Sequence, residues 1–457
     1  MREFREFGHK MIDWVADYLE SPERYSVLST VKPNDIIDGL PAHGPEQGET
    51  IEHIFEDFER IILPGITHWN HPRFLAFFAN TSSPPAILAE LLATALNANG
   101  FIWKVSPAVT ELEVVALRWL LHWFGLPRDW FGMILDTAST ATLHGIAAAR
   151  AAIAPETRDI GAPNDLVLYM SDQAHSSVEK GAMSLGIGRR NVRSIGTDSE
   201  FRMLPELLVD AIQKDREAGL RPFCVVATVG TTSTASIDPV PAIADVAERE
   251  GLWLHVDAAY AGSAAVVPEF RWILDGCERA DSLVFNPHKW LMVPVDCSVF
   301  YCRRPDVLRH AFSLVPEILR TSDSGLNLMD YGIPLGRRFR ALKLWFVLRY
   351  YGHEGLAQII REQVAMTRDL RDRMAEDPRF EICAPAQLSV ICFRQRGTDE
   401  ANRLLLDAIN GSGRFYLSST LVGGRYILRI AIGNMFTSRA TLEELWSLLD
   451  ALVATME

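Results

Sequence analysis

A lysine and an aspartate, each at the end of an apolar run, are the residues of this sequence best suited to chemistry. Lys289 closely follows the apolar residues 282–285, and Asp257 directly follows the largely apolar residues 252–256. If both runs are strands of one sheet, the amine and the carboxylate lie at neighbouring strand ends. A lysine can form a Schiff base with an aldehyde cofactor, and an aspartate can keep the nitrogen of a pyridine ring protonated. The pair therefore predicts a site for pyridoxal 5'-phosphate (PLP).

The surrounding sequence alternates helix-like and strand-like segments from about residue 73 to 345. Helices are expected at residues 86–97, 112–124 and 141–152, and strands at 166–170, 223–229, 253–256 and 282–285. The strands are continuously apolar, which predicts an α/β fold with a mainly parallel sheet that helices cover on both faces. Ligands bind at the carboxyl ends of such strands. Those ends carry polar residues at 171–175, 230–232, 257–259 and 286–289.

Two further segments flank this large domain. Residues 1–72 contain two amphipathic helical runs that look too extended to fold alone. We therefore expect this segment to cover a second copy of the chain in an obligate homodimer. Residues 346–457 are expected to form a smaller α+β domain, with a hairpin turn at 423–424 and a last amphipathic helix at 442–456. The expected domains are thus 1–72, 73–345 and 346–457.

Composition argues against several classes of function. The chain has 457 residues and a formal net charge of −13, and no dense basic run could neutralise a nucleic-acid backbone. The six cysteines show no C-x-x-C spacing, which argues against zinc and against a disulfide framework. No signal-like N-terminus and no apolar stretch of about twenty residues is present. We expect a soluble cytoplasmic protein that binds no nucleic acid, metal or membrane.

Longer motifs run through the chain in one order. They are MIDWVA (11–16), GITHW (65–69), SPAVTELE (106–113), SDQAHSSVE (171–179), HVDAAYAGSA (255–264), NPHKW (286–290) and IPLGRRFR (333–340). In these motifs the chain resembles the group II PLP-dependent decarboxylases, and most closely the aromatic L-amino acid decarboxylases. The likeness weakens in the C-terminal domain. It implies fold type I of the PLP-dependent transferases, with a large domain, a small C-terminal domain and a helical N-terminal segment.

The resemblance assigns roles to the residues at the strand ends. Lys289 would hold PLP as a Schiff base and exchange it for the substrate amine, while Asp257 would face the ring nitrogen. Ala259 is small enough to let the ring lie flat. His175 would stack on the other ring face and reach the substrate carboxylate. The implied reaction is the decarboxylation of an aromatic L-amino acid to an arylalkylamine and carbon dioxide.

The resemblance also implies where the cofactor phosphate binds. Its expected contacts are Thr137, Ala138, Ser139, Asn286 and His288. The first three stand at the start of a predicted helix, where hydroxyls and backbone N–H groups can bind an anion. Thr232 matches a threonine beside the substrate carboxylate. The family often has glycine where this chain has Asp136, and a carboxylate there would repel phosphate unless it points away.

A second departure from the family bears on the product. A family loop carries a tyrosine that protonates the carbanion left after decarboxylation, and the matching residue here is Ile318, which cannot donate a proton. Members with phenylalanine at this position let the carbanion react with dioxygen, which yields an aldehyde, ammonia and hydrogen peroxide. Two possibilities stay open: a decarboxylase that uses another acid, such as Tyr331, His175 or water, and an oxygen-consuming aldehyde synthase.

Aromatic and amide side chains are expected to line the substrate pocket. They are Trp69, Phe77, Phe78, Phe101, Asn80 and Asn99, with Phe101 crossing the dimer interface if the family geometry holds. The two asparagines stand where the family more often has a threonine and an apolar residue. Their amide groups favour hydroxylated aromatic rings as substrates.

Two other classes compete with this interpretation. A metallohydrolase could use His68, His71, His255 and His288, but the sequence has no H-E-x-x-H motif. An inactive binding protein of the same fold would account for Ile318 and Asp136. The presence of Lys289, Asp257 and His175 argues against it.

Overall fold

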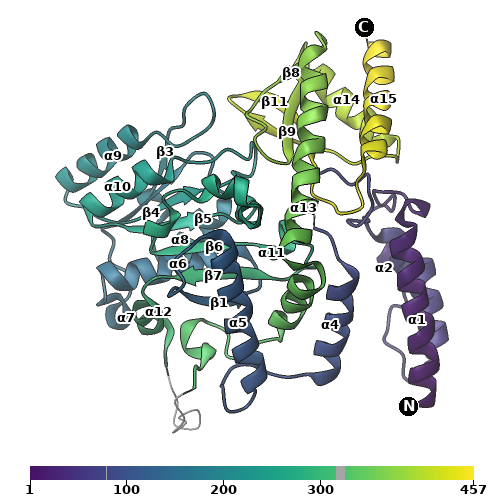
Figure 1. Cartoon of the computed structure of the whole chain (residues 1–457), viewed down its shortest axis with the longest axis horizontal. Helices are drawn as coiled ribbons and strands as arrows, with labels where there is room; N and C mark the ends of the chain where they lie inside the picture. Colours follow the sequence, from purple (N-terminus) through teal and green to yellow (C-terminus); the bar gives the residue numbers. More distant parts are fainter. Residues whose placement is uncertain (79, 315–324, 457) are drawn as a thin grey trace. The chain divides into compact units, whose positions relative to one another are not determined.

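The computed structural model describes residues 1–78, 80–314 and 325–456 of the chain (Figure 1). The chain forms two compact units. Unit 1 comprises Met1–Ala79, Arg379–Glu381 and Arg394–Glu457, and unit 2 comprises Asn80–Pro378 and Ile382–Phe393. The N-terminal segment and most of the C-terminal part, which the sequence analysis treats as separate domains, thus belong to one unit. Among the described residues, no helix has the length and apolar character needed to cross a bilayer.

Unit 2 contains the predicted central sheet, whose strand order is β1-β7-β6-β5-β4-β2-β3. Its strands are β1 (Phe131–Leu135), β2 (Leu166–Ser171), β3 (Val192–Ile195), β4 (Arg221–Thr228), β5 (Trp253–Asp257), β6 (Ser282–Phe285) and β7 (Ser298–Cys302). Strand β7 is antiparallel to both neighbours, whereas β6, β5, β4, β2 and β3 pair in parallel. Every residue of β5, β6 and β7 is buried, so the mainly parallel buried sheet is confirmed.

The described residues of unit 2 also form helices. They are α4 (Pro84–Leu96), α5 (Pro107–Phe124), α6 (Ala138–Ile153), α7 (Thr157–Ile160), α8 (Ser176–Ser184), α9 (Pro205–Glu217), α10 (Val240–Glu250), α11 (Pro287–Trp290), α12 (Pro305–Phe312) and α13 (Arg340–Glu376). Helix α6 packs against strands β4 to β7, and α5 packs against β1 and α13. Capping residues define helix ends. Thr137 caps the start of α6, and Gly125, whose φ is +73°, terminates α5. The predicted helices and strands are present, but β1, β3 and β7 were not predicted.

Unit 1 combines helices with strands of a second sheet. The helices include α1 (Arg2–Glu20), α2 (Asp35–Gly39), α3 (Ile51–Asp57), α14 (Asp399–Gly411) and α15 (Arg439–Met456). The second sheet has the order β10-β11-β9-β8, with β8 (Phe380–Ile382), β9 (Val390–Gln395), β10 (Ser418–Val422) and β11 (Arg425–Ala431). Ile382 of β8 and residues 390–393 of β9 belong to unit 2. Strands β10 and β11 are joined by the predicted glycine turn, where Gly423 and Gly424 have φ of +56° and +75°. The predicted α+β character of the C-terminal part is confirmed.

The two amphipathic runs near the N-terminus pack on each other within unit 1. Phe7 of α1 meets Phe55 of α3 with 5.6 Å between ring centroids, and Trp14 meets Phe55 and Phe58 at 5.9 and 5.7 Å. From the sequence, a second subunit is expected to cover both apolar stripes. In the structure each stripe covers part of the other, although Phe4, Met11 and Ile54 stay exposed.

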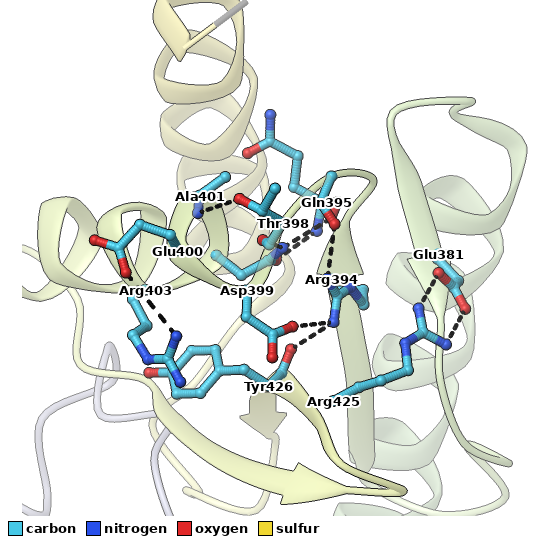
Figure 2. A network of polar contacts seen from close by, with 12 residues as sticks. Glu381, Arg394, Gln395, Thr398, Asp399, Glu400, Ala401, Arg403, Arg425 and Tyr426 are labelled. Atoms are coloured by element: carbon cyan, nitrogen blue, oxygen red, sulfur yellow. Dashed lines mark hydrogen bonds and ion pairs between the residues drawn. The ribbon is translucent and has the colours of Figure 1, made fainter.

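A polar network joins β9, β11 and the start of α14 (Figure 2). Arg394 is 4% exposed and donates to Asp399 Oδ1 at 2.8 Å and to the Tyr426 carbonyl at 3.1 Å. Thr398 caps α14 by accepting the N–H of Ala401 at 3.1 Å. The guanidinium thus links the helix start to the sheet through charge-assisted hydrogen bonds.

Candidate active site

Lys289 lies in the short helix α11, directly after strand β6. Its backbone N–H donates to the Asn286 carbonyl at 2.9 Å, and the N–H of Asn286 donates to the Ala259 carbonyl at 3.0 Å. The Asn286 side chain accepts a hydrogen bond from Ser298 Oγ at 2.7 Å. These contacts tie the turn to β7 and to the end of β5. The half-buried lysine therefore extends from a well-supported strand end.

Asp257 is the last residue of β5, the neighbour of β6 in the sheet. It is 4% exposed, and its Oδ1 accepts the N–H of Ala259 at 3.0 Å. Strands β5 and β6 are parallel, with Asp257 opposite Val284. The carboxylate and Lys289 therefore follow adjacent strand ends at the same edge of the sheet, where the sequence analysis expects them.

His175 follows β2, whose carboxyl end lies at this same edge, and it caps helix α8. Its Nδ1 accepts the N–H of Ser177 at 3.2 Å and lies 2.7 Å from Ser177 Oγ. A neutral ring held in this way carries its proton on Nε2. Burial of the ring lowers the pKa of His175, the Asp257 carboxylate raises it and the Lys289 ammonium lowers it. Strands β2, β4, β5 and β6 pair in parallel, so the three predicted residues follow strand ends at one edge of the sheet of unit 2.

The predicted phosphate contacts stand at the start of α6. Thr137 Oγ1 accepts the N–H of Thr140 at 3.4 Å, while the exposed Ser139 and half-buried Ala138 form the first turn. Asp136 Oδ1 accepts the N–H of Thr137 at 2.6 Å, so this carboxylate occupies one amide of the helix start. Arg340 donates to the two carboxylate oxygens of Asp296 at 2.8 and 3.1 Å. Burial lowers the pKa of Arg340, whereas Asp296 and then Asp136 raise it.

Thr232 lies exposed in the loop that follows β4. The neighbouring hydroxyls hold this loop together, since Thr231 Oγ1 lies 2.9 Å from Thr234 Oγ1 and accepts the N–H of Ser236 at 3.0 Å. Asp238 closes the loop by accepting the N–H of Thr228 at 2.7 Å, and burial raises the pKa of this carboxyl to about 6. The loop presents Thr232 outward from a rigid base.

His288 is 8% exposed, and its Nδ1 accepts the N–H of Cys297 at 2.9 Å. Burial, followed by the adjacent Lys289 ammonium, lowers the pKa of His288 to about 4. The ring is therefore neutral at pH 7 and carries its proton on Nε2, so it can donate one hydrogen bond. A neutral donor suits the predicted phosphate contact.

The predicted substrate-pocket residues are divided between the two units. Trp69 and Phe77 stack in unit 1 with 5.9 Å between ring centroids, and Phe78 is buried there. Asn80, Asn99 and Phe101 belong to unit 2. Asn99 Oδ1 accepts the backbone N–H of Arg337 at 2.8 Å, so this amide oxygen has a structural partner. Asn80 Oδ1 is buried without a hydrogen-bond partner among the described residues.

The position that decides the expected product, Ile318, lies outside the described residues. Tyr331, one of the alternative proton donors, stacks on Phe131 with 4.4 Å between ring centroids. Phe131 begins β1, which runs parallel to β6 because both are antiparallel to β7. Tyr331 therefore lies beside the opposite edge of the sheet from Lys289, which disfavours it as the acid.

A buried ion pair near the site escaped the sequence analysis. Arg337 Nη2 lies 2.7 Å from Glu113 Oε1, and the side chains are 7% and 2% exposed. Both residues stand in the motifs SPAVTELE and IPLGRRFR, but nothing in their spacing signals that they pair. The pair binds both backbone groups of Ile134, at 2.7 and 2.8 Å, two residues before Asp136.

The histidines of the metallohydrolase alternative have other partners. His68 Nδ1 lies 2.9 Å from the Tyr18 hydroxyl, His71 Nδ1 accepts the N–H of Arg73 at 3.0 Å, and His255 Nδ1 lies 2.8 Å from Ser282 Oγ. In the part of the chain that the structure describes, no three His, Cys, Asp or Glu side chains are grouped as metal ligands would be. The histidines thus serve the packing of both units.

The residues of this region fit PLP. Lys289 offers the amine for the cofactor aldehyde, and the buried Asp257 offers an anion for the ring nitrogen. Ala259 is 7% exposed beside that carboxylate and leaves the ring face without a bulky side chain. The start of α6 and the neutral His288 supply donors for a phosphate.

Comparisons with known proteins agree with this chemistry. Residues 33–396 match the family model described as the pyridoxal-dependent decarboxylase conserved domain. The chain is 44% identical to the aromatic-L-amino-acid decarboxylase of Bos taurus, over 99% of this chain and 96% of that protein. It is 40% identical to the phenylacetaldehyde synthase of Arabidopsis thaliana, over 98% and 95% of the two chains.

A solved structure shares the whole fold. The tryptophan decarboxylase of Catharanthus roseus, in complex with L-tryptophan, superposes with a TM-score of 0.95 at 39% identity, and covers 100% of this chain and 99% of its own. The predicted family, fold and cofactor are therefore confirmed. This chain belongs to the PLP-dependent decarboxylases, and within them to the aromatic amino acid decarboxylase family of carboxy-lyases.

Proposed function

We propose that this enzyme decarboxylates aromatic L-amino acids to the corresponding arylalkylamines and carbon dioxide. The observation that carries the proposal is that His175, Asp257 and Lys289 follow the carboxyl ends of the parallel strands β2, β5 and β6 at one edge of the sheet. An amine, a buried anion and a neutral imidazole are the groups that a PLP-dependent decarboxylation needs. The aromatic decarboxylases among the relatives support an aromatic substrate.

PLP, when bound, accepts the electrons that remain when the substrate carboxylate leaves as carbon dioxide. The residues of this chain would prepare that step. Asp257 would keep the ring nitrogen protonated, because its carboxylate is buried and already oriented by the N–H of Ala259. His175 would present Nε2–H as a donor to the substrate carboxylate, because Ser177 occupies Nδ1. Lys289 would exchange its bond to the cofactor for the incoming amine.

A second candidate product is the aldehyde, and Ile318 is the residue that favours it. An isoleucine cannot return a proton to the carbon that loses carbon dioxide. Dioxygen would then accept two electrons from that carbon and form hydrogen peroxide, and water would displace the nitrogen as ammonia and supply the aldehyde oxygen. The similarity to a phenylacetaldehyde synthase supports this alternative, whereas the similarity to aromatic decarboxylases supports the amine.

Product analysis separates the two reactions. Purified enzyme with PLP and substrate should release carbon dioxide and amine in equal amounts, with no uptake of oxygen. Hydrogen peroxide and ammonia equal to the carbon dioxide would overturn the amine proposal in favour of the synthase. Ile318→Tyr should shift any aldehyde product towards amine, and an unchanged product ratio would show that this position does not decide the outcome.

One variant and one control test the cofactor site itself. The visible absorbance of the bound cofactor should be lost in Lys289→Ala, because the covalent link requires that amine. Arg2→Ala removes an exposed cation of α1 and should leave the absorbance unchanged. A colourless wild-type protein in the presence of PLP would contradict the assignment of Lys289.

The substrate preference is tested with four amino acids. Relative turnover of phenylalanine, tyrosine, dihydroxyphenylalanine and tryptophan should favour a hydroxylated ring if an asparagine amide meets the ring. Because Asn99 Oδ1 is held by the N–H of Arg337, Asn80 is the better candidate for that contact. A preference for phenylalanine, or an unchanged preference in Asn80→Ala, would count against it.

We also propose that the enzyme works as a homodimer. Helix α4 packs on α13 and leaves Leu88, Leu91, Leu92 and Leu96 between 47% and 64% exposed. A row of leucines on one helix is a large apolar surface for a single chain, and a second copy would cover it. Light scattering should report twice the chain mass, with Leu91→Glu shifted towards the monomer. A wild-type monomer would contradict the proposal.

A further inference from the structure

Two buried polar side chains stand just before Lys289, and each has its acceptor atom occupied. Asn286 is 2% exposed and His288 is 8% exposed. Asn286 Oδ1 accepts the hydroxyl of Ser298 at 2.7 Å, and His288 Nδ1 accepts the N–H of Cys297 at 2.9 Å. Among the described residues, neither Asn286 Nδ2 nor His288 Nε2 has a hydrogen-bond partner. Donors without a protein partner on such buried side chains point to a ligand that accepts hydrogen bonds.

The partners of these two side chains are successive residues where β7 begins. Strands β6 and β7 are antiparallel, with Phe285 opposite Val299. One step further along this register Asn286 faces Ser298, so the hydroxyl meets the amide across the strand pair. Ser298 is fully buried, and its hydrogen bond to the amide oxygen is therefore shielded from water.

The segment 296–298 is itself held in place on both sides. Asp296 accepts two hydrogen bonds from Arg340 at the start of α13, at 2.8 and 3.1 Å. The N–H of His288 donates to the Cys297 carbonyl at 3.3 Å, in addition to the bond between Cys297 and the imidazole. The segment is thus a fixed support for the residues before Lys289.

We propose that Ser298 is a positioning residue for the phosphate of PLP. An amide can turn end over end, and only one of its two orientations presents N–H groups to an anion. By donating to Asn286 Oδ1, the Ser298 hydroxyl favours that orientation, just as the N–H of Cys297 leaves the proton of His288 on Nε2. Without the hydroxyl, the amide oxygen loses its partner and the amide is free to turn. This inference rests on the expected contact of Asn286 and His288 with the phosphate.

The test compares PLP with pyridoxal, which has the same ring and aldehyde but no phosphate. Both are titrated into the full-length protein after removal of its cofactor, and binding is followed by visible absorbance. Ser298→Ala should raise the dissociation constant of PLP about tenfold, the effect of one weakened hydrogen bond to a charged group. It should leave the dissociation constant of pyridoxal unchanged. The phosphorus NMR signal of bound PLP should also move in Ser298→Ala, and this readout does not depend on activity.

Ser282→Ala is the matched control. Ser282 is also a fully buried serine, and its Oγ lies 2.9 Å from Trp253 Nε1 and 2.8 Å from His255 Nδ1. It begins β6, at the other end of the strand from the Lys289 turn. The control variant should lower the thermal midpoint and leave the ratio of the two dissociation constants as in the wild type.

A double variant tests whether Ser298 acts through Asn286. Asn286→Ala should also weaken PLP binding, and Asn286→Ala/Ser298→Ala should add nothing further. The inference is overturned if Ser298→Ala binds PLP as the wild type does, if it weakens PLP and pyridoxal equally, or if the double variant is additive. Unchanged PLP binding in Asn286→Ala would refute the phosphate contact and the inference with it. A wild-type enzyme that binds PLP but is inactive on every aromatic amino acid would refute the proposed function instead.

Discussion

Replacing Glu113 of the buried Glu113–Arg337 ion pair with leucine should destabilise unit 2 by about 3–5 kcal/mol. The two residues are 1% and 8% exposed, and Glu113 Oε1 lies 2.7 Å from Arg337 Nη2. Removing the carboxylate leaves the guanidinium buried without its counter-charge. It also frees the N–H of Ile134, which donates to Glu113 Oε1 at 2.7 Å.

The position of Ile134 in the sheet explains what the Glu113–Arg337 ion pair binds. Strand β1 is the last strand on one side of the sheet as described, with β7 as its neighbour. A terminal strand has backbone groups without a partner strand, and the ion pair binds those of Ile134. Glu113→Leu/Arg337→Met removes both charges together. It should be less destabilised than the sum of the single changes, with a coupling of about 2 kcal/mol.

Urea unfolding followed by circular dichroism measures these costs, at fixed protein and PLP concentrations because bound cofactor adds to stability. The control is Glu6→Ala, which removes an ion pair of similar length between Arg2 and Glu6 whose side chains are 92% and 61% exposed. That change should cost less than about 1 kcal/mol. Additive costs at Glu113 and Arg337, or equal costs at Glu113 and Glu6, would refute the argument from burial.

Three further outcomes follow from local packing and charge. Burial lowers the pKa of His144 and of His255 to about 4. Between about pH 6.5 and pH 4, these histidines therefore bind protons in the unfolded chain but not in the folded chain. The free energy of unfolding should therefore be level above pH 6.5 and fall towards pH 4, and a level value from pH 7 to 5 would contradict this. Gly145→Ala places a Cβ atom 2.6 Å from Nδ1 of His255 and should lower the thermal midpoint, whereas Gly8→Ala, in open space on α1, should stabilise by about 1 kcal/mol. If Gly145→Ala and Gly8→Ala change stability in the same direction, the packing of residue 145 against His255 would not be the cause. Ser177→Ala removes the hydroxyl beside His175 Nδ1, which should move the acid limb of the kcat profile to higher pH, and Ser177→Thr should restore it.

Local sequence was enough to predict the elements that carry the site. The strand at Ser282–Phe285 and the one ending at Asp257 are continuous apolar runs followed by a polar residue, and the structure has both. Strands β1 and β3 lie at the sheet margins and are partly exposed, and the short β3 contains the polar residues Arg193 and Ser194. Strand β7 is buried throughout, but it is not among the strands predicted from the sequence.

The sequence by itself determined which groups stand at the strand ends, because a strand and its last residues are encoded within about ten positions of the chain. Lys289, Asp257, His175 and the family motifs are features of this kind. Tertiary structure alone decided which distant groups meet. The strand order β1-β7-β6-β5-β4-β2-β3 differs from the order along the chain. It places β1, whose Ile134 binds Glu113 and Arg337, at one end of the sheet. Likewise, the register of β10 and β11 brings Ser418 and Arg429 to Phe77. No local sequence pattern predicts this contact, because the segments that form it are more than three hundred residues apart.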